Sequence, residues 1–185
     1  MASNYIVWDA EILETLSKGD ARFAHPENLT LTIACTIDHA GEHRSFYGNP
    51  EEIGEMLELF KRYQFVAGFN STRFDNYLVD GLMGWSQGSL NALLGLKHID
   101  LMAHIQKALG HRVSLASIGE ALGMPKTGSG ADAPAMWRAG KHKEVIAYCF
   151  QDVAITRAAY LSAAVHGYIP YATRGRIERA YVRVE

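Results

Sequence analysis

Apolar and polar positions in the first part of the chain alternate in the way that β-strands require. Residues 4–8 form a short run of β-branched and aromatic residues, and residues 29–37 alternate threonine with aliphatic side chains. Such alternation buries one face of a strand. A glycine-containing turn at 39–41 precedes residues 44–47, which predicts a hairpin. Three strands in succession are therefore expected.

Helical spacing begins after Pro50, because apolar side chains recur at intervals of three and four within residues 51–63. Further along, the sequence predicts a strand at 65–69, a helix at 76–83, a strand at 98–101, a helix ending at Gly110, a helix at 115–122, a loop at 126–135, a long helix at 141–165 and a tail at 168–185. This order predicts an α/β fold with one mixed sheet of about five strands and helices on both faces.

We expect one domain over residues 1–185, with residues 168–185 as a C-terminal tail or hairpin. The composition, 48% hydrophobic and 21% charged, is typical of a globular domain. The chain has no run of about 18 apolar residues, and its first residues lack the pattern of a signal peptide. Cys35 and Cys149 have no metal-type spacing, and one such pair fits a reducing compartment. The sequence therefore predicts a cytoplasmic protein without a membrane partner.

The net charge of -2 hides an uneven distribution. Residues 1–75 contain 6 Lys and Arg against 12 Asp and Glu, whereas residues 76–185 contain 12 against 8. Acids that hold cations and bases that hold phosphate would suit a partner that is anionic and associated with metal. Chance variation in sign along a chain gives the same pattern, so the distribution decides nothing alone.

Asp9 and Glu11 are the first candidate site residues. They stand at the end of the first predicted strand, and side chains at i and i+2 of a strand point to the same face. Two carboxylates therefore emerge together at the carboxyl end of a strand, where α/β proteins often bind ligands. A strand that simply runs into a charged loop would show the same spacing.

Two further acids follow, one at the start of a predicted helix and one inside the long predicted helix. Residues 69–75 leave an apolar strand, turn and enter a helix at Asp75, where an acid either caps the helix or lies beside the first strand. Tyr148 and Asp152 are four residues apart in the long helix and share one face. Apolar residues surround them, and an acid in such surroundings needs a partner or a metal.

Together, these motifs resemble those of the DEDD-type 3′–5′ exonucleases, the DnaQ-like group of the ribonuclease H-like fold. The motifs, in order, are Asp-x-Glu at 9–11, Asn-x-x-x-Phe-Asp at 70–75 and Tyr-x-x-x-Asp at 148–152. The tyrosine makes the chain similar to the DEDDy branch, which includes proofreading domains of family B DNA polymerases. Many relatives carry threonine where this chain has Ile12, so the hydroxyl that grips the 3′-terminal nucleotide is missing here.

The resemblance implies a sheet whose first three strands are antiparallel and whose later strands are parallel. It also implies stepwise release of mononucleotides from the 3′ end of single-stranded nucleic acid, with DNA favoured over RNA. The hydrolysis would use two divalent ions, Mg²⁺ or Mn²⁺, which prefer oxygen ligands.

The family pattern also implies a role for each site residue. Asp9 bridges both ions, Glu11 and Asp152 bind one of them, and Asp75 supports the other. Tyr148 orients the attacking water, because a phenol with a pKa of about 10 is a poor base near neutral pH.

Residues near the motifs are expected to bind the substrate. Asn70 and Phe74 belong to the second motif, and Lys126 and Trp137 lie in the basic stretch 111–143. A basic side chain can contact phosphate and an aromatic ring can stack on a base. The glycine-rich part of this stretch is equally typical of a mobile surface loop.

Two alternatives share the same motifs. An RNA exonuclease would carry the same acids, because selection against a 2′-hydroxyl depends on the shape of the pocket. A catalytically silent module that brings a helicase or polymerase to nucleic acid would keep the fold, although the intact acids favour an enzyme. No polymerase domain is attached, so any proofreading would act in trans.

Overall fold

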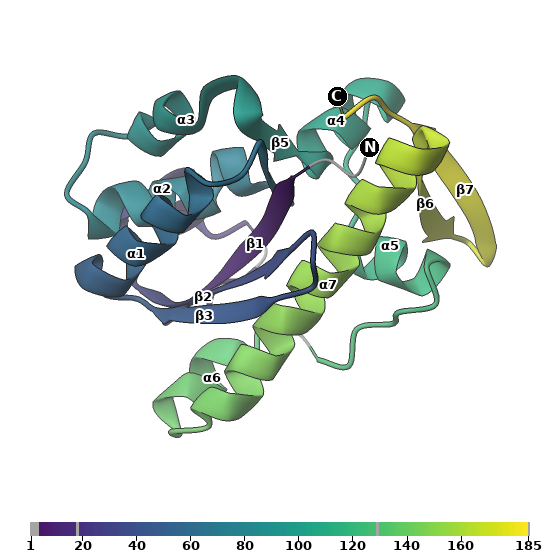
Figure 1. The fold of residues 1–185 in the computed structure, drawn as a ribbon. Coiled ribbons are helices and arrows are strands. Elements are labelled where there is room, and N and C mark those ends of the chain that lie inside the picture. The colour runs from purple at the N-terminus through teal and green to yellow at the C-terminus, as the bar shows by residue number, and fades with distance from the viewer. Residues whose placement is uncertain (1–3, 18, 129, 185) are drawn as a thin grey trace.

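A computed structural model describes residues 4–17, 19–128 and 130–184, which form a five-stranded mixed sheet with helices on both faces (Figure 1). The strand order is β3-β2-β1-β4-β5, in which β1 pairs antiparallel with β2 and parallel with β4. β3 is antiparallel to β2, and β5 is parallel to β4. The predicted fold class is therefore confirmed. The strands are β1 (Tyr5–Ile12), β2 (Leu31–Asp38), β3 (His43–Tyr47), β4 (Phe65–Gly68) and β5 (His98–Asp100).

Two hydrophobic cores lie on opposite faces of the sheet because β1 alternates its side chains between them. Ile6 and Trp8 point into the core formed with α1, α2 and α3, and Tyr5 and Val7 point into the core formed with α4, α5 and α7. The helices are α1 (Pro50–Phe60), α2 (Asp75–Leu82), α3 (Ser89–Leu94), α4 (Leu101–Leu109), α5 (Leu115–Ala121), α6 (Ala133–Arg138) and α7 (His142–His166).

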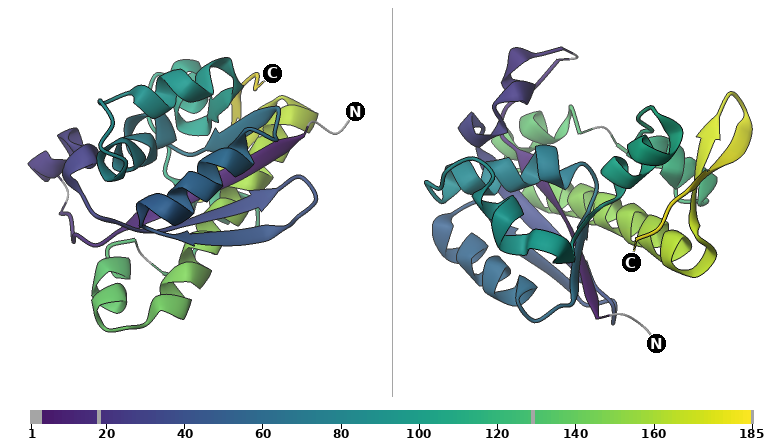
Figure 2. Two further views of the ribbon diagram at one scale, coloured as in Figure 1. Left: turned by 60° about the vertical axis from the view of Figure 1, so that its left-hand side comes forward. Right: turned by 90° about the horizontal axis from the view of Figure 1, so that it is seen from above.

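The C-terminal segment forms a hairpin, one of the two forms expected for it. β6 (Tyr168–Thr173) and β7 (Arg176–Tyr181) pair antiparallel as a separate two-stranded sheet. The hairpin packs on α5 and on the end of α7, away from the main sheet (Figure 2).

The structure differs from the sequence-based expectations at three places. β1 continues to Ile12, so Asp9 and Glu11 lie within the strand, because β2 supplies partners as far as Leu31. α3 was not expected, and α6 occupies the end of the expected loop 126–135 and the residues after it. Both helices have six residues, too few to show a helical period. None of the described helices is long and apolar enough to cross a membrane.

Candidate active site

The central strand of the sheet places two carboxylates on the face that α7 covers. Asp9 and Glu11 continue the row begun by Tyr5 and Val7 on this face. Glu11 is 8% exposed, and Asp9 pairs with Cys35 of β2. β2 pairs with β1 along this stretch, at Asp9–Cys35 and Glu11–Ile33, whereas the pairing of β1 with β4 ends at Val7.

Asp75 reaches the same site from a tight turn between β4 and α2. Asn70 begins this turn in the left-handed region, with φ of 66°, which asparagine tolerates better than most residues. Asp75 is the first residue of α2 and is 4% exposed. A hydrogen bond from the backbone N–H of Ala10 stabilises its carboxylate, so β1 and α2 are joined at the site.

Asp100, at the end of β5, fixes the conformation of that turn. Its carboxylate accepts hydrogen bonds from the backbone N–H groups of Asn70 (2.9 Å) and Thr72 (3.0 Å) and from the Thr72 hydroxyl. It also accepts from the N–H of Ala103 (3.2 Å) at the start of α4. One buried carboxylate therefore holds both the turn before Asp75 and the helix after β5.

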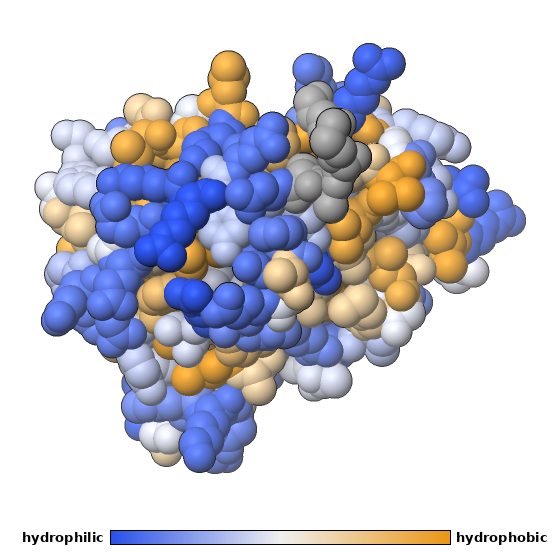
Figure 3. Space-filling view, in the orientation of Figure 1, coloured by the Kyte–Doolittle hydropathy of each residue, from blue (hydrophilic) through white to orange (hydrophobic). Residues whose placement is uncertain are grey.

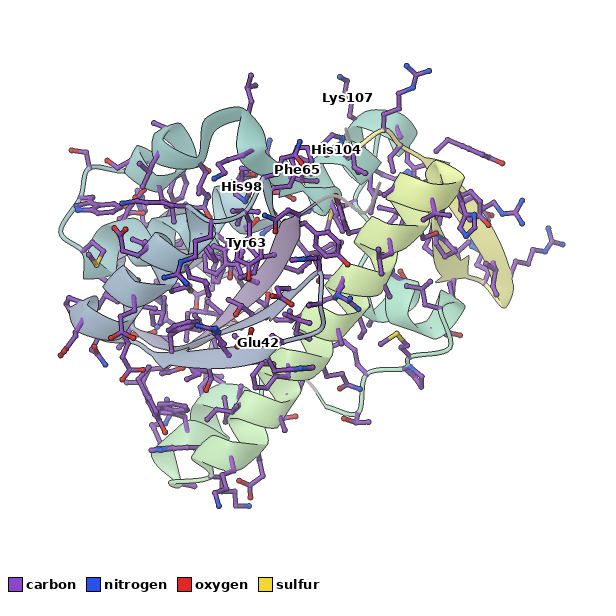
Figure 4. All side chains as sticks on the ribbon, viewed as in Figure 1. Glu42, Tyr63, Phe65, His98, His104 and Lys107 are labelled. Atoms are coloured by element: carbon purple, nitrogen blue, oxygen red, sulfur yellow. The ribbon has the colours of Figure 1, made fainter. Side chains whose placement is uncertain are left out.

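A polar network joins the turn to the side chain of His98, which is labelled in Figure 4. Asn76 Nδ2 lies 3.2 Å from His98 Nδ1, and Ser71 Oγ lies 3.1 Å from His98 Nε2. Burial lowers the pKa of His98 to about 4, so the ring is neutral near pH 7. Since an amide NH₂ can only donate, Nδ1 is the acceptor and Nε2 carries the proton.

α7 brings the third motif over the acids of β1. Tyr148 and Asp152 are buried on the face of α7 that packs on the sheet. Lys126, from the segment after α5, places its Nζ 2.6 Å from Asp152 Oδ2 and 4.7 Å from the centre of the Tyr148 ring. Asp152 Oδ1 is buried and has no hydrogen-bond partner among the described residues.

Burial raises the pKa of all four carboxyl groups, and repulsion from other acids adds to the rise at Asp9, Glu11 and Asp75. Burial, followed by the charges of Asp75, Asp152 and Glu11, raises the pKa of Asp9 well above its ordinary value. Burial and the charge of Asp152 raise the pKa of Glu11 to about 8, and burial is also the main reason why the pKa of Asp75 rises to about 7. The pKa of Asp152 is raised by burial as well, although Lys126 opposes the rise. These four acids lie close together, with the ammonium group of Lys126 beside them. Bound cations would therefore stabilise their charged forms.

The donor set fits hard divalent cations. Carboxylate oxygens are the ligands that Mg²⁺ and Mn²⁺ prefer, and the orphaned Asp152 Oδ1 is a buried acceptor that such an ion would satisfy. The Cys149 thiol also lies nearby, with ligand atoms of Asp9, Glu11 and Cys149 within 4.8 Å of one another. Burial raises the pKa of Cys149, which keeps the thiol protonated. The carboxylates are therefore the chemically suited ligands.

Gly128 and Gly130, in the loop between α5 and α6, lie close to the Tyr148 side chain. A Cβ on Gly128 would lie 3.2 Å from Cδ2 of the Tyr148 ring, and one on Gly130 would lie 3.4 Å from its hydroxyl. Beside this contact is a cavity of about 680 Å³, bounded by this loop, α6 and α7. The loop thus forms one wall of the site.

The structure places the predicted substrate-binding residues at different distances from the acids. Asn70 and Phe74 lie in the turn before Asp75, and Lys126 contacts Asp152 directly. Trp137 lies on α6, where its ring stacks on His142 at 4.2 Å between ring centres. The Trp137 ring thus contacts the aromatic rings of Tyr47 and His142.

Sequence reasoning missed several residues that shape the site. Asp100 shows only the signal of a helix cap, and its bonds to Asn70 and Thr72 join positions about 30 residues apart. Arg112 donates to Asn70 Oδ1 at 2.7 Å, and its basic charge was the only available signal. Arg138 ties α6 to the segment after β1 through the backbone oxygen of Leu13, at 2.6 Å.

Comparison with protein families decides the superfamily. The profile described as the RNase H superfamily matches residues 22–161, which is most of the chain. The chain belongs to the RNase H superfamily. The matched region contains Asp75, Tyr148 and Asp152, and it begins after Asp9 and Glu11.

A solved structure shows the same fold at low sequence identity. This RNase H superfamily chain is similar to the family B DNA polymerase from the hyperthermophilic archaeon Pyrobaculum calidifontis, with a TM-score of 0.65 and 14% identity. The match covers 87% of this chain and 24% of the polymerase chain. No curated protein sequence matches the chain.

Proposed function

We propose that the protein is a metal-dependent 3′–5′ exonuclease of the DEDDy type, which releases mononucleotides from the 3′ end of single-stranded nucleic acid. The observation that carries this proposal is the convergence of four carboxyl groups and one tyrosine, from three separate motifs, on one face of β1. The raised pKa values of the carboxyl groups and the unpaired Asp152 Oδ1 support it. A bound cation would stabilise the charged carboxylates and would give Asp152 Oδ1 a partner.

In this mechanism, Asp9 would bridge two Mg²⁺ or Mn²⁺ ions, Glu11 and Asp152 would bind one, and Asp75 would support the other. When bound, the ions supply an activated water and stabilise the leaving 3′ oxygen of an in-line displacement. The chain's own residues hold the reacting groups in place. Their placement on β1, α2 and α7 would hold the carboxylates in position relative to the scissile phosphate.

Tyr148 orients the attacking water through its hydroxyl. Burial and the charge of Asp152 raise the pKa of Tyr148 above its ordinary value, so the phenol keeps its proton throughout the physiological range. It therefore acts as a hydrogen-bond donor and not as a general base. Lys126 neutralises Asp152 before the ions bind and would contact the phosphate of the terminal nucleotide.

Asn70 and Phe74 would hold the 3′-terminal nucleotide, because they lie in the turn that leads directly to Asp75. Trp137, which is stacked on His142 here, would stack on a base of the strand. We favour DNA as the substrate, with RNA as the alternative. A polymerase or helicase would be a partner in trans.

The test is a cleavage assay with 5′-labelled single-stranded DNA and RNA of equal sequence, in Mg²⁺, Mn²⁺ or EDTA. We expect a ladder that shortens from the 3′ end in either metal, disappears in EDTA and is lost in Asp9→Ala. Tyr148→Phe keeps the ring but removes the hydroxyl, so cleavage should fall by roughly 100-fold while the melting temperature stays near that of the wild type. Strand binding without cleavage in either metal would instead identify a catalytically silent binding module.

A further inference from the structure

The tip of the C-terminal hairpin forms one side of a polar hollow that the proposed reaction does not use. The hollow has a volume of about 560 Å³ and lies between this hairpin and the segment after α4. Its lining residues are His111, Tyr171, Thr173, Arg174, Arg176 and Glu178. Residues from two parts of the chain thus create a basic concave surface.

The guanidinium groups of this hollow are available to a ligand. Within the described parts of the chain, neither Arg174 nor Arg176 makes a side-chain hydrogen bond or ion pair. Glu178, the acid that lines the hollow, accepts a hydrogen bond from the Tyr171 hydroxyl at 2.8 Å. Hydrophilic side chains appear at the right-hand edge of the molecule in Figure 3, where Figure 1 places the hairpin.

The hairpin turn itself carries one of these arginines at an unusual position. Arg174 and Gly175 connect β6 to β7 with φ values of 46° and 74°. A two-residue turn with positive φ at both positions favours asparagine, aspartate or glycine first. An arginine with a Cβ is disfavoured there, so turn geometry does not account for it.

A short segment links this hollow to the candidate active site. His111 lines the hollow, and the next residue, Arg112, donates to Asn70 Oδ1 at 2.7 Å. In the right-hand view of Figure 2, the tip of the hairpin points toward the same edge of the molecule at which β1 ends. Basic groups therefore extend from the turn before Asp75 to the hairpin.

We propose that Arg112, Arg174 and Arg176 bind the sugar–phosphate backbone of a single strand, on the 5′ side of the nucleotide being removed. This inference rests on the proposed function, and it assigns a second binding region to the same substrate. A chain of phosphates is the ligand that would engage separated arginines on one path. Arginine also presents a fork of donors that suits phosphate oxygens.

The test compares a short and a long strand with the same 3′ sequence, of 4 and 15 nucleotides (roughly the range of a single-strand site). Fluorescence anisotropy in EDTA gives the Kd of each strand without cleavage. The variant is Arg174→Asn with Arg176→Ala, because asparagine suits the turn. The control is Arg44→Ala with Arg62→Ala, which removes the same charge from exposed positions on β3 and after α1.

We expect the hairpin variant to weaken binding of the long strand by about tenfold. The loss for the short strand should be much smaller. The slope of log K against log salt for the long strand should also fall by about 1.4, since each single-strand phosphate contact contributes about 0.7. The control variant should change neither the length dependence nor the slope by a comparable amount.

Equal losses for both lengths, or losses matched by the control, would overturn the hairpin proposal. The same preparations are then tested for cleavage in Mn²⁺. Binding and cleavage are thus measured independently, so failure of the second binding region can be distinguished from failure of the exonuclease proposal. A wild-type protein that cleaves while the hairpin variant binds the long strand normally overturns only the second binding region. A wild-type protein that binds the long strand through the hairpin but never cleaves overturns the exonuclease.

Discussion

At the scale of single residues, Gly128 leaves room for the Tyr148 ring. In Gly128→Ala, the new Cβ would lie 3.2 Å from the ring, and we expect the ring to shift by a few tenths of an ångström. Misplacement of a group that orients the reacting water should lower kcat by roughly tenfold, with little change in melting temperature. Steady-state cleavage and thermal denaturation measure the two effects.

Gly54→Ala is the matched control for that variant. A Cβ on Gly54 of α1 meets nothing within 4 Å, and alanine is the better helix former by up to about 1 kcal/mol. This control should therefore melt slightly higher and cleave normally. A Gly128→Ala protein with unchanged kcat would show that the loop yields in place of the ring.

Lys126 occupies Asp152 Oδ2 and should compete with a divalent ion for it. In Lys126→Met, we expect the Mn²⁺ concentration needed for half-maximal thermal stabilisation to fall by about tenfold, equivalent to ~1.4 kcal/mol. The reason is that the ammonium group, 2.6 Å from Oδ2, no longer opposes the ion. Lys143→Met removes an exposed charge from the start of α7 and serves as the control. A midpoint that rises or does not move would contradict the competition.

Residue types and spacings pointed to the residues of the candidate site, but they did not point to the residues that hold those side chains in position. Asp9, Glu11, Asp75, Tyr148 and Asp152 each stand in a short motif with an expected side-chain direction, and the structure brings them together. Asp100 and Arg112 act through contacts between residues distant in sequence, such as the 2.7 Å bond from Arg112 to Asn70. Spacing carries no information about such contacts.

At the scale of elements, the turn between β4 and α2 depends on one carboxylate from β5. Asp100→Ala leaves the part-buried N–H groups of Asn70 and Thr72 without their acceptor. We expect a loss of roughly 2–4 kcal/mol in the free energy of unfolding and a larger fall in cleavage, because Asp75 follows the turn. Urea unfolding and cleavage assays measure these changes.

Loss of the N-terminal cap of α1 provides the comparison for Asp100→Ala. Asn49 accepts from the N–H of Glu52 at 3.0 Å at the start of α1, so Asn49→Ala should cost ~1 kcal/mol and leave cleavage unchanged. If Asp100→Ala behaved in the same way, Asp100 would be a helix cap and nothing more.

Among the elements, long periodic segments were predictable and short ones were not. The strands at residues 29–37 and 65–69 and the long helix at 141–165 were found near their observed bounds. α3 and α6 were missed because about two turns of helix give no clear period. The extension of β1 through Glu11 depends on pairing with β2, which an acidic segment does not reveal.

At the scale of the whole molecule, the clustered acids make stability depend on pH and metal. The folded pKa values of Glu11 and Asp75, about 8 and about 7, exceed those of unfolded acids. Between roughly pH 4 and pH 8 the folded state therefore binds more protons than the unfolded state, so stability falls as pH rises. In EDTA, we expect the melting temperature to fall by roughly 5 °C or more across this window.

Saturating Mg²⁺ or Mn²⁺ should reverse that trend, because the ions bind the deprotonated carboxylates. A Glu11→Gln and Asp75→Asn double variant should show a flatter profile in EDTA and a smaller response to metal. Differential scanning calorimetry at several pH values tests both points. A wild-type profile that rises with pH in EDTA would contradict the raised pKa values.

The position of Tyr148 and Asp152 on α7 has a consequence for synthesis of the protein. A ribosome releases Asp9, Glu11 and Asp75 first, and α7, which covers them, begins only at His142. A nascent chain without α7 lacks the fourth acid and leaves one face of its sheet exposed. Any hydrolytic activity must therefore wait until α7 has emerged and folded onto β1. The growing polypeptide would accordingly carry an incomplete site until the residues of α7 have left the ribosome.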